Sequence, residues 1–297
     1  VKVDGGLPVY RSEGKCSVEI PSNVLGRDIL FSGVITDGAG SPQALTEGLG
    51  VASFKLESGD RVSLSKGILG ERVSDTTSRM HKIIAERVLA PVDVLYNVVA
   101  YGQDGKSPII EITSQVKNSA EWFGGAEKGA ADAARSEISG VKSIPDGVKF
   151  SAVRVHSFSK AGFLGVPGKE GIMRIGMDCL IQLLPERSMV VRYADPRVGY
   201  RTLSYLDYGL NANGVQEVSL IYKWNLTIRP EDEDLLAKNQ KVVPEQPIVF
   251  YISREVPERL RPAIRAGIMD WQSAFENAGF KDAIQVKDAD ASVDLSL

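Results

Sequence analysis

The segment SFKLESGDRVSL, residues 53–64, contains two runs in which polar and apolar side chains alternate. Successive side chains of a β-strand point to opposite faces, so this alternation is typical of strands that are buried on one face. A short turn that contains glycine, residues 58–60, joins the two runs, and the segment therefore predicts an antiparallel β-hairpin. A second hairpin is predicted for residues 92–101 and 108–113, joined by the turn residues 103–106.

The remainder of the N-terminal and central region also favours strands. Three longer alternating runs predict one antiparallel sheet with a solvated face, over residues 148–158, 172–184 and 215–228. Residues 37–50 are rich in glycine, serine and proline and predict a mobile loop. The alanine-rich residues 126–139 have no wide apolar face and predict a short surface helix or a flexible stretch. Apolar residues at helical spacing predict a helix over residues 77–89.

The pattern changes after residue 247. The apolar run Ile248–Ile252 is typical of a strand buried on both faces. A helix is expected to begin near Pro262 and to end before Gly279, which suits a C-terminal cap. A second strand begins at Ala283, so the region predicts a βαβ unit. The apolar stripe of the expected helix consists of Ile264, Ile268, Trp271 and Phe275.

These patterns together predict an α+β fold in which most of the sheet is antiparallel. The length of 297 residues suggests about two domains. We expect three regions along the chain: a β-rich N-terminal region over residues 1–70, a central α+β domain with an antiparallel sheet over 71–240, and the βαβ piece over 247–297.

Composition and charge exclude several classes of protein. The chain has 35 Lys and Arg against 38 Asp and Glu, a formal net charge of -3, and 43% hydrophobic residues. A disordered chain would have less apolar content and more net charge. A dedicated nucleic-acid binder would carry a basic excess, so no nucleic-acid partner is expected. No apolar run approaches the length of a transmembrane helix, and no such segment is expected.

The common catalytic motifs are absent from the sequence. It contains no His-Glu-x-x-His, no Gly-x-Ser-x-Gly, no P-loop and no Cys-x-x-Cys. The two histidines, His81 and His156, lie far apart, and the two cysteines, Cys16 and Cys179, are expected to be buried free thiols. We therefore assign no catalytic residue and no metal ligand to this chain, and expect it to be inactive by itself.

One polar segment, RYADPRVGY at residues 192–200, stands out by its density of arginine, tyrosine and aspartate. One interpretation is an ordered turn in which Asp195 accepts backbone amides and pairs with an arginine. The other is a segment that docks against a cleft or has a regulatory role; its candidate residues are Arg192, Tyr193, Asp195, Arg197 and Tyr200. A second aromatic and acidic cluster, residues 205–209, is expected to serve packing rather than ligand binding.

A set of short segments is distinctive by its order and spacing. The segments are Val18–Pro21, Leu25–Asp28, Ala194–Tyr200, Ser204–Tyr205, Asp207–Gly209, Lys223–Leu226, Asp270–Trp271, Ala274–Phe275 and Ala278–Lys281. In this order they resemble a family of large bacterial zinc-dependent metalloproteases of the metzincin type. The resemblance extends over nearly the whole chain.

The resemblance implies that two domains of unknown role precede a metzincin catalytic domain, and that residues 247–297 are the opening of that domain. The zinc-binding helix of the family would lie further downstream, so none of its ligands is carried onto this sequence. The parent protein is expected to be a secreted, periplasmic or cell-envelope peptidase that needs zinc, whereas this chain needs no cofactor. The expected partners are the C-terminal catalytic half of the same polypeptide and a protein or peptide substrate.

Two roles remain open at this stage. In the first, the chain is a scaffold or propeptide-like cover for the zinc domain, and Asp195 could then block the zinc site as an acidic plug. In the second, the chain is a non-catalytic β-rich module that binds a protein or glycan.

Overall fold

The computed structural model describes residues 2–38, 45–67, 70–87, 92–124, 130–157, 172–186, 188–211, 214–290 and 293. The chain divides into two compact units. Unit 1 consists mainly of Val1–Ser188 and Ser204–Val218, and unit 2 mainly of Met189–Leu203 and Ser219–Leu295. The regions 1–70, 71–240 and 247–297 stay a prediction, although the main sheet of unit 1 joins strands from both sides of residue 70.

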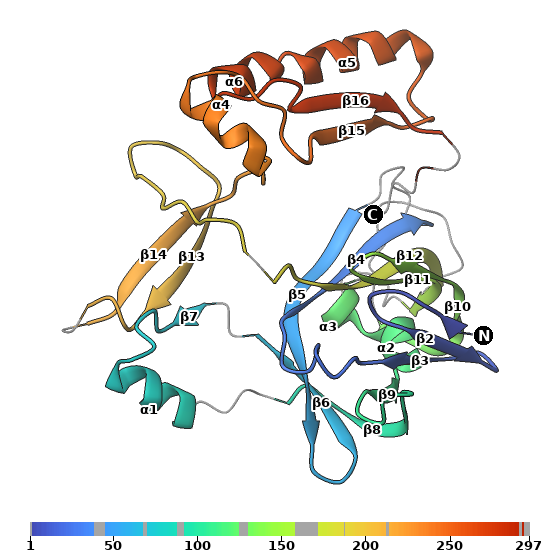
Figure 1. The fold of residues 1–297 in the computed structure, drawn as a ribbon. Helices are drawn as coiled ribbons and strands as arrows, with labels where there is room; N and C mark the ends of the chain where they lie inside the picture. Colours follow the sequence, from blue (N-terminus) through green and yellow to red (C-terminus); the bar gives the residue numbers. More distant parts are fainter. Residues whose placement is uncertain are drawn as a thin grey trace. The chain divides into compact units, whose positions relative to one another are not determined.

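Unit 1 is built around an antiparallel sheet of eleven strands in the order β1-β2-β3-β9-β8-β6-β5-β4-β12-β11-β10 (Figure 1). The strands are β1 (Lys2–Val3), β2 (Val9–Ser12), β3 (Lys15–Glu19), β4 (Ile29–Asp37), β5 (Leu45–Glu57), β6 (Arg61–Lys66), β8 (Val94–Tyr101), β9 (Pro108–Glu111), β10 (Ala130–Ile144), β11 (Gly147–Ser157) and β12 (Ile172–Leu183). The sheet curls so that its end strands, β1 and β10, come into contact. Arg11 of β2 reinforces this closure, because its guanidinium donates a hydrogen bond of 2.7 Å to the carbonyl of Ile138 in β10.

Both predicted hairpins are confirmed. β5 pairs with β6, with Phe54 opposite Leu64, and the turn uses the positive φ angles of Gly59 (75°) and Asp60 (51°). β8 pairs with β9, and Asp104 holds the connecting turn through hydrogen bonds from the amides of Lys106 and Ser107 and the Ser107 hydroxyl, at 2.9, 2.8 and 2.6 Å. Both turns are local in sequence, which explains why the pattern revealed them.

Three expectations need correction. Residues 130–139 belong to strand β10, not to a helix or flexible stretch, because pairing with β11 overrides the helical preference of alanine. Residues 45–50, expected in a mobile loop, form the start of β5 and pair with β4. The strand expected over residues 215–228 is shorter, because β14 covers Gln216–Ile221, and it lies in a different sheet from β11 and β12. Residues 39–44 of the expected loop and residues 126–129 of the alanine-rich segment lie outside the described residues.

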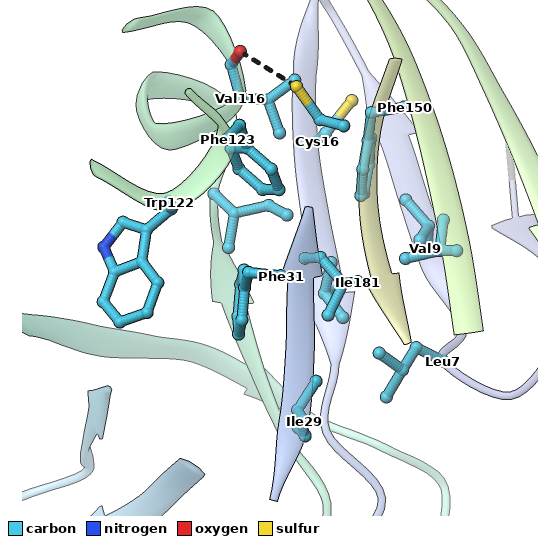
Figure 2. Close-up of a cluster of buried hydrophobic side chains, with 14 of the residues drawn as sticks. Leu7, Val9, Cys16, Ile29, Phe31, Val116, Trp122, Phe123, Phe150 and Ile181 are labelled. Carbon is cyan, nitrogen blue, oxygen red and sulfur yellow. Dashed lines mark hydrogen bonds between the residues drawn. The ribbon is translucent and has the colours of Figure 1, made fainter. Parts of the chain in front are cut away.

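The core of unit 1 lies between the curled sheet and two short helices, α2 (Thr113–Asn118) and α3 (Ala120–Phe123) (Figure 2). Trp122 and Phe123 of α3 are buried, and the Trp122 ring lies 5.0 Å from that of Phe31 on β4. Burial of an aromatic side chain of this size contributes about 1.5–3 kcal/mol. The two helices therefore act as the inner packing element of the sheet.

Arg154 of β11 ties these helices to the sheet from within the core. The side chain is fully buried, and its guanidinium donates to the carbonyls of Val116 at 2.9 Å and Gly124 at 3.2 Å, and to the Sγ of Cys179 at 3.4 Å. The carbonyls at the C-terminal end of a short helix have no partner within the helix, and Arg154 supplies one. Cys16 and Cys179 are buried free thiols, as predicted. Burial raises the pKa of Cys179 to about 11, so this thiol is neutral at pH 7.

A smaller sheet has the strand order β14-β13-β7. β13 (Thr202–Asp207) pairs in parallel with β7 (Glu71–Arg72). The helix predicted over residues 77–89 is confirmed as α1 (Arg79–Arg87) within the described residues.

Unit 2 contains the predicted βαβ unit. β15 (Ile248–Ile252) and β16 (Ile284–Asp288) are parallel, and α5 (Arg261–Met269) and α6 (Gln272–Asn277) connect them. Before this unit in the sequence lie a short 3-10 turn, η2 (Pro230–Asp232), and α4 (Glu233–Ala237). A second 3-10 turn, η3 (Glu258–Leu260), leads into α5. The expected burial of β15 on both faces is wrong, because Phe250 is 38% and Tyr251 43% exposed.

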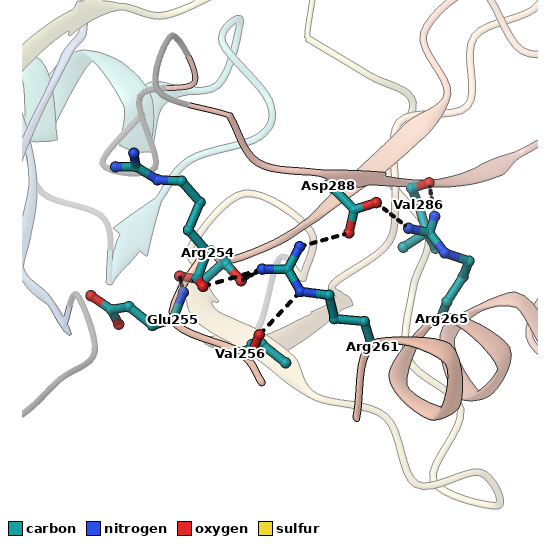
Figure 3. A network of polar contacts seen from close by, with 8 residues as sticks. Arg254, Glu255, Val256, Arg261, Arg265, Val286 and Asp288 are labelled. Atoms are coloured by element: carbon teal, nitrogen blue, oxygen red, sulfur yellow. Dashed lines mark hydrogen bonds and ion pairs between the residues drawn. The ribbon is translucent and has the colours of Figure 1, made fainter. Parts of the chain in front are cut away.

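Asp288 at the end of β16 connects this strand to α5 through ion pairs (Figure 3). Its two carboxylate oxygens accept from Arg261 at 3.3 Å and from Arg265 at 2.7 Å, both on α5. Arg261 also donates to the carbonyl of Val256 at 3.0 Å. Both arginines are engaged in contacts within the βαβ unit, so we interpret this network as structural. The fold class is thus mostly antiparallel β with a parallel βαβ unit, as predicted.

Candidate functional site

The polar segment singled out in the sequence lies in unit 2, beside strand β14. Tyr193 forms an antiparallel bridge with Leu220. The amide of Ala194 donates to the carbonyl of Ser219 at 2.8 Å, and the amide of Ile221 donates to the carbonyl of Arg192 at 3.0 Å. These bonds fix residues 192–194 as an additional extended segment along one side of β14.

On its other side, the segment of residues 219–222 is hydrogen-bonded to Arg201. The amide of Tyr222 donates to the carbonyl of Arg201 at 3.0 Å, and the Arg201 guanidinium lies 5.2 Å from the centre of the Tyr222 ring. Consecutive amides of an extended chain point in opposite directions, so residues 219–222 run between residues 192–194 and Arg201. The structure thereby brings Arg192 and Tyr193 into one region with Arg201 and Tyr222.

We call this region the arginine–tyrosine patch and define it by Arg192, Tyr193, Tyr200, Arg201 and Tyr222. All five side chains are exposed, Tyr193 to 64% and Tyr222 to 57%. The neighbouring Trp224 is also exposed and contacts the ring of Phe250 edge-on, with 6.3 Å between the centroids. Arginine and tyrosine, together with tryptophan, are enriched among the residues that carry most of the binding energy at protein interfaces.

The patch is basic, although the whole chain is acidic. Residues 189–203 and 219–229 contain five basic side chains, Arg192, Arg197, Arg201, Lys223 and Arg229, against the single acid Asp195. Asp195 is already paired with Arg197. A local basic excess of this kind creates a positive potential that favours an anionic partner.

Asp195 and Arg197 form the ordered turn that one interpretation of the sequence predicted. The carboxylate accepts the amide of Arg197 at 3.0 Å, and the guanidinium donates to both carboxylate oxygens, with Nε 2.9 Å from Oδ1 and Nη2 2.5 Å from Oδ2. The side-chain hydrogen bond from Arg197 lowers the pKa of Asp195, so the carboxylate stays charged at neutral pH. The pair is solvent-exposed, so it contributes little stability.

The second cluster, residues 205–209, has a structural role at Asp207. This carboxylate is buried and accepts hydrogen bonds from the amide of Gly209 at 2.8 Å and from the amide and hydroxyl of Ser74. Burial raises the pKa of Asp207, but the hydrogen bonds outweigh this effect and leave the pKa lowered. The contacts bind β13 to the turn that precedes α1, in agreement with a packing role.

The described residues do not fit a zinc ion. No three His, Cys, Asp or Glu side chains among them are placed to share a metal. His156 is buried on β11, whereas His81 lies on α1. We therefore assign no metal ligand and derive no metal chemistry for the described residues. No helix within them has the length and apolar character that crossing a membrane requires.

Sequence reasoning missed two members of the patch, Arg201 and Tyr222. Tyr222 belongs to the alternating run that predicted a strand, and Arg201 follows directly after the polar segment. Their contact depends on the pairing of distant segments, and the local pattern carries no signal for it.

The fold and the patch define a β-rich protein with an exposed aromatic and basic surface. The chain belongs to a family described as a domain of unknown function (DUF5117), whose model matches residues 46–229. This match includes the whole patch and ends before β15. No curated protein and no solved structure matches the chain.

Proposed function

We propose that this chain is the non-catalytic N-terminal part of a zinc-dependent metallopeptidase of the metzincin type, located outside the cytoplasm or in the cell envelope. Peptide-bond hydrolysis would be carried out by a zinc domain downstream in the same polypeptide. The described residues would serve as a scaffold or a propeptide-like cover. The ordered set of segments that resembles this family supports the proposal.

The observation that carries the proposal is the unburied apolar surface of the βαβ unit. Neither α5 nor α6 contains a buried residue, and Trp271, between them, is 65% exposed. Phe250 and Tyr251 of β15 are exposed as well. Large exposed apolar surfaces mark sites where other protein packs. Further strands of a catalytic domain would cover this surface.

The direct test is a comparison of this chain with the complete polypeptide encoded by the natural gene. Both proteins are purified, their zinc content is measured by metal analysis, and peptide hydrolysis is assayed with and without a chelator. The proposal expects zinc and chelator-sensitive hydrolysis in the complete polypeptide, and neither in this chain. A complete polypeptide that binds no zinc and cleaves no peptide would overturn it.

A plug role for Asp195 makes a separate prediction. Asp195 would have to exchange Arg197 for the metal, which is feasible because their pair is exposed. In the complete polypeptide, Asp195→Ala is then expected to increase peptidase activity before activation, with Arg197→Ala as the matched control that leaves the carboxylate in place. Unchanged latency and zinc occupancy in Asp195→Ala would rule out the plug.

A second candidate function is a non-catalytic module that binds a protein or a glycan. The arginine–tyrosine patch favours this alternative, because exposed aromatic rings are suited to binding either kind of ligand. A chain that is stable and monomeric alone, with a natural gene that encodes no zinc domain, is expected in that case.

A further inference from the structure

We infer that the outer edge of residues 189–193 binds an extended acidic segment of a separate protein by strand addition. The inference does not depend on the proposed zinc domain, because it rests on the backbone and charge of the patch alone.

The backbone of this segment is used on one side only. The carbonyl of Arg192 and the amide of Ala194 are bonded to β14. In an extended chain the polar groups of the intervening residue face the other way, so the amide and carbonyl of Tyr193 point away from β14. Within the described part of the chain, no backbone hydrogen bond is made to Tyr193 or Val191.

The side chains of the segment are unusually exposed for their type. Val190 is 81% and Val191 52% exposed, and Met189 and Tyr193 are also exposed. An exposed apolar edge with free backbone groups is a template for pairing with another strand, and natural proteins normally protect such edges. The partner must therefore offer alternating amides and carbonyls. A polypeptide has these groups at the required spacing, whereas a glycan or nucleic acid does not.

Charge selects the kind of polypeptide. Arg192 is exposed and makes no ion pair among the described residues. An acidic segment paired with this edge would place a carboxylate against the Arg192 guanidinium, which binds it through paired hydrogen-bond donors. A second copy of this chain would instead bring Arg192 close to its own equivalent, and like charges oppose such pairing. The charge of the edge thus favours a separate acidic partner.

The test is a fluorescence anisotropy titration of the full chain with a labelled short peptide in which glutamate alternates with valine. Two control peptides are used: one with alternate backbone amides N-methylated, and one with lysine in place of glutamate. Each is expected to bind at least about tenfold more weakly, because the first loses backbone bonds and the second reverses the charge. Binding of the glutamate peptide is also expected to weaken as salt is raised.

Variants locate the binding site. Arg192→Glu is expected to weaken binding of the glutamate peptide about tenfold, whereas Arg259→Glu, an exposed charge reversal on η3 of the same unit, is expected to leave it unchanged. Circular dichroism of both variants checks that they fold, and the N-methylated peptide tests the edge without any variant.

Three results would each overturn the inference. The first is absence of binding by the glutamate peptide. The second is equal binding of the glutamate peptide and its N-methylated form, which would indicate a surface that binds any anion. Dextran sulfate would then displace both peptides equally well. The third is self-association of the chain, seen by analytical ultracentrifugation, that Arg192→Glu abolishes, since this would assign the edge to a second copy.

Discussion

Arg154 shows how one residue joins three parts of unit 1. Its guanidinium is buried, pairs with no carboxylate of the described residues, and donates to the carbonyls of α2 and of Gly124. Removing the donor leaves these acceptors buried and unpaired, and each such acceptor costs about 1–3 kcal/mol.

We therefore expect Arg154→Met to lower the free energy of unfolding by roughly 3 kcal/mol or more. The matched control is Arg174→Met, because Arg174 forms an ion pair with Glu137 in which both side chains are exposed. Such pairs contribute about 0–1 kcal/mol. Urea denaturation of the two variants measures the difference, and equal losses would show that Arg154 has no special role in the core.

Asp104 gives the protein a defined response to acid. Hydrogen bonds from the Ser107 hydroxyl, and then from the Lys106 and Ser107 amides, lower its pKa from 3.8 to about 2. A carboxylate whose pKa is lower in the folded state stabilises the fold above the pKa of the unfolded chain. Its contribution is therefore complete above pH 4, roughly the unfolded value, and is lost as the pH falls toward about 2.

The measurement is the stability of the natural chain and of Asp104→Asn across this pH range. The advantage of the natural chain is expected to shrink as the pH falls from about 4 to about 2, because the asparagine does not titrate. A difference that stays constant with pH would contradict the role assigned to the turn.

At the scale of single elements, the sequence pattern predicts those strands and turns that are formed by residues close together in the sequence. The hairpins β5–β6 and β8–β9 were predictable because their strands and turns are adjacent in sequence. β10 was not, because its alanine-rich sequence becomes a strand only through pairing with β11. The candidate site divides in the same way: the Asp195–Arg197 turn was predictable from two nearby residues, whereas the contact of Arg201 with Tyr222 required the fold.

The difference in burial between α3 and the helices of the βαβ unit gives a further prediction. Trp122 on α3 is buried, and Trp271 is largely exposed. Trp122→Ala is expected to lower the free energy of unfolding by about 3–5 kcal/mol. Trp271→Ala is expected to change it by less than about 0.5 kcal/mol in this chain. Urea denaturation tests both, and a large loss in Trp271→Ala would show that the βαβ unit already has a packing partner in this chain.

At the scale of the whole molecule, the two units differ in how completely they bury their apolar residues. Unit 1 has one large core inside its curled sheet. Unit 2 exposes aromatic and aliphatic side chains on the βαβ unit and on residues 189–193. We explain this difference by two interactions: the proposed packing of a zinc domain against the βαβ unit, and the binding of an acidic strand at the outer edge of residues 189–193.

The most direct test of the central proposal is to sequence the natural gene beyond the codon for Leu297. We predict a continuing reading frame that encodes His-Glu-x-x-His and a third histidine, the ligand set of a metzincin zinc site. A stop codon directly after Leu297, or a continuing frame without these histidines, would contradict the proposal and favour the binding module.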